Sequence, residues 1–352
     1  MPGPSPTPAH TRDSVHARRL TAQLLAGAPA RDPLAVAERL LAIQGQDPRG
    51  ARLAVRARSR DVSSADVDRA LTDERSLLIT WLNRGTLHLI RSEDYSLLHL
   101  LTTPQLRTSS STRLAQEGLD ARATERALAV IERTLGADGP RTRRDLAARL
   151  QQAGIRTEGQ ALIQLMFRAG LDGIAIRGPM IGRQHAYVLV RDWLPPQPRL
   201  DRDRALAELA RRYLAGHGPA DARDLARWAG ISLRDARAGL EAIATELRIR
   251  PDGLAELAGG RAAPAPPPRL LGAFEPLLLG WSSREPVLGE HASRVVLGGV
   301  FRGFALAGGR AVAIWRLHDE RVELEPFTAL EPSVTAALAD DAHAVRRFLG
   351  LA

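Results

Sequence analysis

The chain has 352 residues, 44% hydrophobic and 25% charged, which supports a buried core spread over two or three small domains or one composite fold. It carries a formal charge of +9 and no cysteine, which excludes disulfides, thiolate metal sites and a cysteine nucleophile. No uncharged apolar run approaches the ~18 residues of a membrane span, so we expect none. The absence of cysteine fits the cytoplasm, where we expect the protein to be. Residues 1–13, rich in Pro, predict a disordered tail rather than a signal peptide.

The positive charge rests on arginine, since the sequence contains no lysine. Arginine binds phosphate through paired hydrogen bonds and stacks on bases, so this composition favours double-stranded DNA as a partner. A GC-rich coding sequence is the alternative explanation for the missing lysine, but it does not remove the positive field. We find no heptad run that indicates a dimer, and we expect a monomer.

The first part of the chain predicts helices followed by a hairpin. Apolar residues recur at helical spacing from Ser14 to about Ala70, and Asp32 and either Ser63 or Ser64 stand where helix N-caps are expected. The segment 77–90 predicts two short strands around a turn. In a winged helix, helices are followed by a small hairpin. We therefore predict a winged helix for residues 14–125.

An internal repeat follows. Gly139-Pro140 and Arg144-Asp145-Leu146-Ala147 are matched, at the same spacing, by Gly218-Pro219 and Arg223-Asp224-Leu225-Ala226. Each copy then reaches Ala-Gly-Ile, which is typical of a helix, a turn and a second helix. We predict winged helices over residues 126–196 and 197–262. The chain would then have two winged-helix domains, or three if the first unit is one as well.

The last part of the chain changes character after a Pro-rich connector at 263–268. Residues 269–352 predict strands and loops closed by a helix from Ser333 to Leu349, a small β-rich segment that completes the fold. The predicted class is therefore α+β and mainly helical, with two to three tandem winged-helix domains.

Several kinds of chemistry are excluded by the residues present. The nine histidines are dispersed and no metal-binding spacing occurs, so we expect no metal and no cofactor. A chain without lysine has no P-loop and no lysine Schiff base. A Gly-x-Ser-x-Gly elbow is also absent. What remains is either no catalysis or chemistry performed by amides, carboxylates and water.

Three separated blocks resemble the winged-helix DNA glycosylases of the AlkZ and YcaQ types. The first block is Ile43-Gln44-Gly45-Gln46-Asp47-Pro48-Arg49, the second is Arg84-Gly85-Thr86-Leu87-His88-Leu89-Ile90, and the third covers residues 271–284 and 299–316. The resemblance extends from about residue 14 to 350. The pair Gln44 and Gln46 is similar to the Gln-x-Gln of the AlkZ-like branch, whereas the other branch has Gln-x-Asp. Two departures are Glu275, where the family usually has Asp, and Trp281, where it usually has Tyr.

The resemblance implies a monofunctional DNA glycosylase that hydrolyses the N-glycosidic bond of N7- or N3-alkylated purines. Bulky natural-product adducts or crosslinks would be among its substrates, in DNA repair or self-resistance. Gln44 and Gln46 are the implied catalytic residues, and Gly45 between them predicts a strained turn that leaves both side by side. Without the resemblance, the two glutamines would be assigned to backbone hydrogen bonds at a helix end.

Other residues are predicted to contact DNA or the lesion: Arg56, Arg58, Trp81, Arg84, Thr86, His88, Trp281, Arg284 and Arg316. Arg84, Thr86 and His88 alternate along an expected strand, so they share one face of it. For Trp81 and His88 the alternative is a place in the core, and for Arg56 and Arg58 it is ordinary solvation. Asp47 is a further candidate for water activation, with an N-cap as its alternative.

Two functions other than catalysis fit part of this pattern. A non-catalytic winged-helix transcriptional regulator would use the same arginines and hairpins to bind DNA. A structural or protein-interaction array would fit the charge less well. A requirement for Gln44 and Gln46 in base release would distinguish the enzyme from both alternatives.

Overall fold

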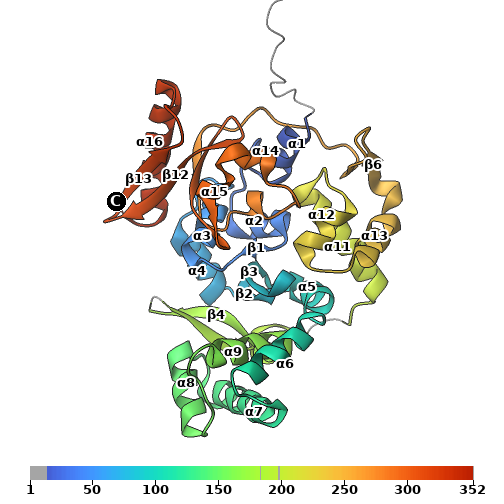
Figure 1. Cartoon of the computed structure of the whole chain (residues 1–352), viewed down its shortest axis with the longest axis vertical. Coiled ribbons are helices and arrows are strands. Elements are labelled where there is room, and N and C mark those ends of the chain that lie inside the picture. The colour runs from blue at the N-terminus through green and yellow to red at the C-terminus, as the bar shows by residue number, and fades with distance from the viewer. Residues whose placement is uncertain (1–13, 183, 197–198, 352) are drawn as a thin grey trace, which may run out of the picture.

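The computed structural model describes residues 14–182, 184–196 and 199–351 (Figure 1). These residues form an α+β, mainly helical protein, which confirms the predicted class. The tail predicted at residues 1–13 lies outside the described residues. Among the described helices, none is long and apolar enough to cross a membrane.

The first unit consists of helices that surround a short sheet. The helices are α1 (Val15–Ala22), α2 (Pro33–Leu40), α3 (Pro48–Arg56) and α4 (Ser64–Thr72), and the strands are β1 (Ile43–Gln44), β2 (Leu77–Leu82) and β3 (Thr86–Arg91). The Asp32 carboxylate accepts from the third residue of its helix, and Ser63 and Asp66 form a capping box. Both predicted N-caps are therefore confirmed.

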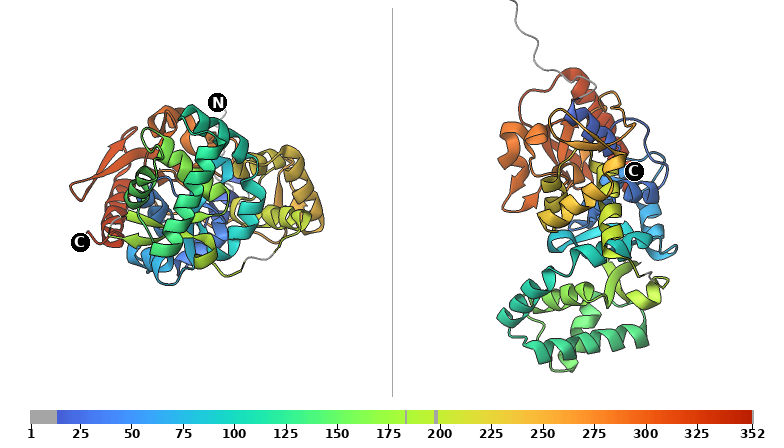
Figure 2. Two further views of the ribbon diagram at one scale, coloured as in Figure 1. Left: turned by 90° about the horizontal axis from the view of Figure 1, so that it is seen from below. Right: turned by 90° about the vertical axis from the view of Figure 1, so that its right-hand side faces the viewer.

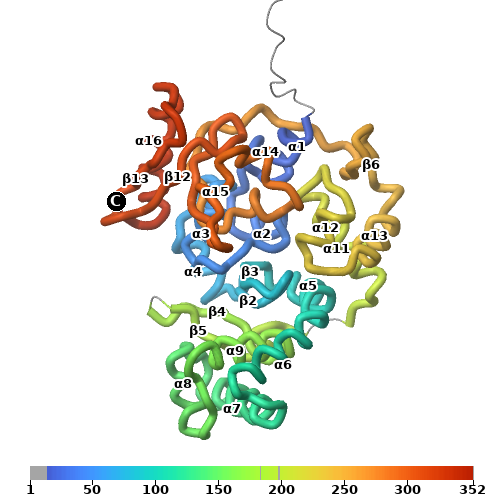
Figure 3. The backbone as a smooth tube through the Cα atoms, in the orientation of Figure 1, coloured from blue at the N-terminus to red at the C-terminus, as the bar shows by residue number. Residues whose placement is uncertain are grey.

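The middle of the chain forms a helical body beneath this unit in Figure 1, as the right panel of Figure 2 also shows. Its elements are α5 (Tyr95–Thr102), α6 (Leu106–Gln116), α7 (Ala121–Asp138), α8 (Arg143–Gln152), α9 (Ala161–Leu171), β4 (Ala175–Ile181), β5 (Gln184–Leu189) and α10 (Val190–Trp193). The two hairpins join in one five-stranded sheet with the order β1-β3-β2-β4-β5. Figure 3 shows β2 and β3 above β4 and β5. The first unit and this body therefore share a sheet.

The third stretch lies at the right of Figure 1 and contains α11 (Arg202–His217), α12 (Ala222–Ala229), α13 (Leu233–Ala242), β6 (Leu247–Ile249) and β7 (Ala255–Leu257). Both copies of the sequence repeat are a helix, a turn and a helix, as predicted. The turn glycines, Gly154 and Gly230, have φ of +69° and +71°, a region that glycine enters at little cost. The number of winged helices and their boundaries stay predictions.

The C-terminal stretch forms a second sheet with the order β13-β12-β11-β8. Its elements are β8 (Arg269–Leu271), α14 (Glu285–Leu288), α15 (Ala292–Val295), β9 (Val296–Leu297), β10 (Val300–Phe301), β11 (Phe304–Ala307), β12 (Arg310–His318), β13 (Arg321–Pro326) and α16 (Pro332–Phe348). The outer strands and α16 stand opposite the third stretch (Figure 1). β9 and β10 pair as a separate small hairpin.

The buried side chains explain how these parts are held together. One core cluster combines α11–α13 with α5 and the C-terminal stretch, and another combines α2–α4, the five-stranded sheet and α7–α9. Burial of apolar surface contributes about 25 cal/mol per Å², so each continuous core stabilises the contact between segments distant in sequence. The space where β1, the β2–β3 turn, α12 and the C-terminal stretch meet contains the candidate site.

Candidate active site

The two predicted catalytic glutamines lie on either side of Gly45, at the end of strand β1. β1 pairs with β3, where Gln44 lies opposite His88, and the Gly45 N–H donates to the Leu87 carbonyl at 2.7 Å. Gly45 is not among the glycines with positive φ, and a Cβ there would meet its neighbours at ordinary contact distances of 3.5 Å or more. The predicted strained turn is therefore wrong: edge-strand pairing, not backbone strain, places the glutamines.

Gln44 and Gln46 line one pocket of about 490 Å³. The segments that meet around it are residues 44–46, the β2–β3 turn, the last turn of α12, the loop 274–284 and the β9–β10 hairpin. Its lining residues are Gln44, Gln46, Arg84, Thr86, Arg227, Phe274, Leu279, Trp281, Arg284, Gly299 and Phe301. Of the predicted site residues, the structure thus brings together Gln44, Gln46, Arg84, Thr86, Trp281 and Arg284.

Gln44 differs from Gln46 in its environment. Gln44 is 7% exposed, and its Oε1 is buried without a hydrogen-bond partner among the described residues. An unsatisfied buried acceptor costs about 1–3 kcal/mol, so a water or substrate N–H that reaches it recovers that energy. Gln46 is exposed. The pair therefore offers one amide at the back of the pocket and one toward solvent.

Three arginines, Arg84, Arg227 and Arg284, give the pocket its charge. Its described lining contains no carboxylate, and none of the three forms an ion pair within the described residues. Desolvation, with repulsion from Arg227 and Arg284, lowers the pKa of Arg84 to about 10, which still leaves Arg84 a cation at neutral pH. Three uncompensated cations attract anions, and the regular anion of DNA is its phosphate.

Aromatic side chains form another wall. Phe274 and Phe301 have ring centroids 5.5 Å apart, and the Arg284 guanidinium lies 5.0 Å from the Phe301 centroid. Phe274 has a φ of +54°, a strained conformation for a residue with a side chain. Beyond Phe301, the tip of the β9–β10 hairpin exposes Leu297 and Val300 by 59% and 57%. The wall is thus suited to stack a flat group, and its rim is apolar.

Arg84 also fastens the β2–β3 turn to α12. Its guanidinium donates to the carbonyls of Arg227 and Trp228, at the C-terminal end of that helix, where positive charge is favoured. A Cβ on Gly230 would lie 2.7 Å from the Arg84 backbone nitrogen, so only glycine permits this approach. The contact brings Arg227 to the pocket.

Arg58 and Arg56 are engaged in contacts within the protein, which corrects the predicted DNA contact of both. The Arg58 side chain is completely buried and paired with Glu275. The guanidinium of Arg56 is held by the Asp341 carboxylate and by the Leu270 carbonyl, and its side chain is only 10% exposed. Buried guanidinium groups are paired because an isolated buried charge is very costly.

Trp81 and His88 lie in the core and not on a DNA-binding surface, whereas the DNA contact predicted for Arg316 stays a prediction. Trp81 is 7% exposed and packs in the core near Tyr187, at 6.4 Å between centroids. His88 is 2% exposed, and its Nδ1 lies 2.9 Å from the Thr86 carbonyl. Arg316 is exposed on β12, paired with Glu323 and away from the pocket. Asp47 caps α3 and does not line the pocket, so the N-cap alternative is confirmed.

Burial of two histidines predicts a stability that depends on pH. Burial lowers the pKa of His88 and of His217 from 6.5 to about 3. Above pH 6.5 neither state binds these protons; as the pH falls from 6.5 toward 3, the unfolded chain takes them up and the folded protein does not. Stability is therefore lost over this range, by several kcal/mol per histidine.

This prediction can be measured by urea denaturation at a series of pH values. We expect His217→Phe, which keeps a ring beside Tyr213, to flatten the pH dependence, and His318→Gln, at an exposed position, to leave it unchanged. Equal slopes for wild type and His217→Phe would contradict the assignment.

Sequence reasoning missed Arg227, Phe274, Leu279, Gly299 and Phe301 in the pocket. Phe274, Leu279, Gly299 and Phe301 lie within the third block that resembles the family, but apolar residues in a β-rich segment are more often core than site. Arg227 follows the repeated Arg-Asp-Leu-Ala segment, and nothing in its sequence neighbourhood separates it from other exposed arginines. Only the Arg84–α12 contact reveals its place.

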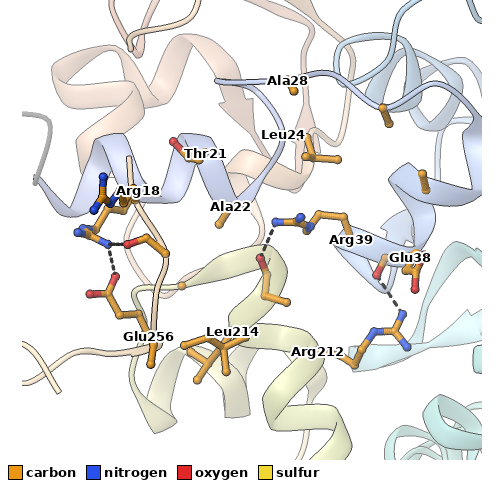
Figure 4. A pocket seen from close by; sticks show the side chains of 18 of the residues that line it. Arg18, Thr21, Ala22, Leu24, Ala28, Glu38, Arg39, Arg212, Leu214 and Glu256 are labelled. Atoms are coloured by element: carbon orange, nitrogen blue, oxygen red, sulfur yellow. Dashed lines mark hydrogen bonds and ion pairs between the residues drawn. The ribbon is translucent and has the colours of Figure 1, made fainter. Parts of the chain in front are cut away.

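A larger pocket, of about 660 Å³, lies between α1, α2 and α11 (Figure 4). Arg18 donates there to Glu256, and Arg212 donates to the Glu38 carbonyl and pairs with Asp94. It contains neither glutamine of the motif, and carboxylates neutralise part of its charge. The smaller pocket around Gln44 is therefore the candidate active site.

The arrangement of helices and hairpins around an arginine-lined pocket fits a protein that binds a polyanion such as nucleic acid. Its fold matches that of Streptomyces sahachiroi DNA glycosylase AlkZ with a TM-score of 0.76, at 23% identity and 96% coverage of both chains. The model of the family described as DNA glycosylase AlkZ-like matches residues 37–348. The chain is also 30% identical to an interstrand DNA cross-link repair glycosylase of Streptomyces sahachiroi, over 96% of each protein.

The chain therefore belongs to the AlkZ-like DNA glycosylase family. It is an enzyme, a hydrolase of N-glycosyl bonds that acts on DNA. The resemblance expected from the three blocks is confirmed, and the non-catalytic regulator is not supported. Assignment to the Gln-x-Gln branch stays a prediction.

Proposed function

We propose that this glycosylase excises N7- or N3-alkylated purines from double-stranded DNA, with Gln44 and Gln46 as catalytic residues. The observation that carries the proposal is the buried, unpaired Oε1 of Gln44 in a pocket whose described lining has amides and arginines but no carboxylate. A reaction in this pocket needs a substrate that departs without a strong general acid. A purine alkylated at N7 or N3 is already cationic and meets that condition.

The reaction is a hydrolysis. The oxygen of a water forms a bond to C1′ of the sugar, the bond between C1′ and the base nitrogen breaks, and its electron pair neutralises the base. The water's proton passes to solvent, and the products are the free alkylpurine and an abasic site. The transition state resembles the oxocarbenium ion of glycoside hydrolysis.

Amide oxygens suit this transition state. The Oε1 of Gln44 and of Gln46 can accept hydrogen bonds from the attacking water and present partial negative charge to the sugar cation. A carboxylate would interact more strongly, but its desolvation in the pocket would cost much more. Because the chain has no lysine, no lysine Schiff base forms with the abasic site, and we propose a monofunctional enzyme.

We also propose bulky adducts and interstrand crosslinks as substrates. A pocket of about 490 Å³ is in the range that accommodates whole small molecules. The aromatic wall offers a stacking surface for a planar substituent. The cross-link repair glycosylase that this chain resembles supports the same choice.

The substrate class is tested with duplexes that carry N7-methylguanine, N3-methyladenine, or a nitrogen-mustard crosslink between guanine N7 atoms. We expect base release from the alkylated purines and unhooking of the crosslink, scored by chromatography and denaturing gels. Release of uracil or 8-oxoguanine in place of alkylpurines would overturn the substrate assignment.

The arginines of the pocket predict a salt dependence of DNA binding. If Arg227 and Arg284 each contact a phosphate, replacement of each by Gln lowers the slope of log K against log salt by about 1. Binding of lesion-free duplex at several salt concentrations measures this slope. Arg69→Gln, at an arginine outside the pocket that is paired with Asp66 and Glu74, is the control. An unchanged slope in the Arg227→Gln, Arg284→Gln variant would refute the phosphate contacts.

A further inference from the structure

The loop 274–284 contributes Phe274, Leu279, Trp281 and Arg284 to the pocket, opposite the glutamine segment. It contains no long helix or strand, only the short 3-10 turn Pro276–Leu278. A reaction that depends on a positioned water requires this side of the pocket to keep a fixed position relative to Gln44. The contacts at the two ends of the loop show how its position is fixed.

A buried ion pair holds the start of the loop. Arg58 and Glu275 are both 0% exposed in their side chains, and the Arg58 Nη2 donates to the Glu275 Oε1. Arg58 also donates from Nε to the Gln23 carbonyl at 2.8 Å, from Nη2 to the Gln23 Oε1 at 2.9 Å, and from Nη1 to the Ala54 carbonyl at 3.0 Å. The Glu275 Oε1 accepts from the Leu277 N–H at 3.1 Å. Glu275 thus links the loop to the end of α3.

The beginning of α3 touches the same part of the chain. A Cβ on Gly50 would lie 2.3 Å from the Ala273 carbonyl oxygen, and one on Gly272 would lie 3.1 Å from the Gly50 Cα. α3 begins at Pro48, and its N-cap Asp47 directly follows Gln46. The glutamines therefore precede the first turn of this helix, and Arg58 follows its last turn. Residues 272–275 contact the helix or Arg58 near both of its ends.

The far end of the loop is held by a different unit. The Trp281 Nε1 donates to the His217 carbonyl at 2.9 Å, and the Ser282 N–H and hydroxyl donate to the Asp224 Oδ1 at 2.9 and 2.6 Å. His217 ends α11 and Asp224 lies in α12. The loop therefore spans from the helix of the glutamines to the helices that supply Arg227.

We propose that the buried Arg58–Glu275 ion pair fixes the position of the loop 274–284 relative to Gln44 and Gln46. Glu275 is then a positioning residue of the glycosylase site. The proposal rests on the proposed function of this pocket. Glu275 follows the strained Phe274 directly, so displacement of its carboxylate moves a ring that lines the pocket. Neither member of the pair touches the pocket, and both act through the loop.

The test compares Glu275→Gln with Asp341→Asn. The second variant breaks the ion pair that Asp341 makes with Arg56, the last residue of the same helix α3, and neither residue lines the pocket. We expect single-turnover base release from N7-methylguanine duplex to fall about 10- to 100-fold for Glu275→Gln, with duplex affinity unchanged. Asp341→Asn should keep the wild-type rate. Glu275→Asp, which keeps the charge, should recover part of the loss.

Hydrogen–deuterium exchange provides a readout independent of activity. We expect faster exchange in peptides that cover 272–284 for Glu275→Gln, and wild-type exchange there for Asp341→Asn. Wild-type rate and wild-type exchange in a folded Glu275→Gln protein would overturn the proposal. If Glu275→Gln does not fold, Glu275→Asp is compared in its place.

The two proposals fail in different ways. If the wild type releases no base from any alkylated duplex, the proposed function fails, while exchange at 272–284 still decides whether the ion pair positions the loop. If the wild type is active and Glu275→Gln and Asp341→Asn lose the same activity, the pair contributes only stability and the positioning role is refuted.

Discussion

Replacement of Gln44 by Ala is expected to lower single-turnover base release about 100- to 1,000-fold, the usual effect of removing one preorganised polar group from an active site. Gln46→Ala should have a similar or smaller effect, because Gln46 is exposed and water can replace part of its role. Since the two amides act on one water, the losses should not add in the double variant. Affinity for lesion-free duplex should remain that of the wild type.

A matched control distinguishes catalysis from loss of a buried amide. Gln164 on α9 also has a buried Oε1 without a partner among the described residues, but it lies outside the pocket. Gln164→Ala should therefore keep the wild-type rate of base release. If Gln44→Ala and the double variant release base as fast as wild type, the assignment of the glutamines is refuted.

Replacement of Arg58 by Met is expected to destabilise the protein by about 3–5 kcal/mol, because the Glu275 carboxylate is then buried without its cation. The double variant Arg58→Met, Glu275→Leu should recover most of that loss, since apolar side chains of similar size often replace a buried ion pair at little cost. Urea denaturation at pH 7 measures both values.

Arg316→Met serves as the control for Arg58→Met, because the exposed pair of Arg316 with Glu323 should contribute at most about 1 kcal/mol. A cost below about 1 kcal/mol for Arg58→Met would contradict the buried-pair argument. The double variant also separates two roles: recovered stability with slow base release would indicate positioning by the ion pair.

Local features were predictable from the sequence because they depend on neighbouring residues. Asp32 and Ser63 cap the helices that follow them, and the Ala-Gly turns of the repeat at Gly154 and Gly230 adopt positive φ. The pairing of β2 with β3 also follows from their short separation. Each of these elements needs contacts over only a few residues.

The site was only partly predictable. Spacing along a strand assigned Arg84, Thr86 and His88 to one face, but Arg84 lies in the turn before β3 and His88 is covered by the protein on its side of the sheet. Arg58 belongs to the same Arg-rich stretch as exposed Arg60, and only packing decides which is buried. Arg227 reaches the pocket through a contact between residues 143 positions apart in the chain.

The sequence by itself determined the charge, the absence of cysteine and lysine chemistry, the mainly helical class and the motif that resembles the glycosylase family. These are properties of composition and of short segments. The tertiary structure alone decided that Gln44 and Gln46 share a pocket with three arginines and an aromatic wall, and that Arg58 and Glu275 lie behind it. The physical reason is that burial and pairing depend on which distant segments meet, and that is set by the shared cores rather than by local pattern.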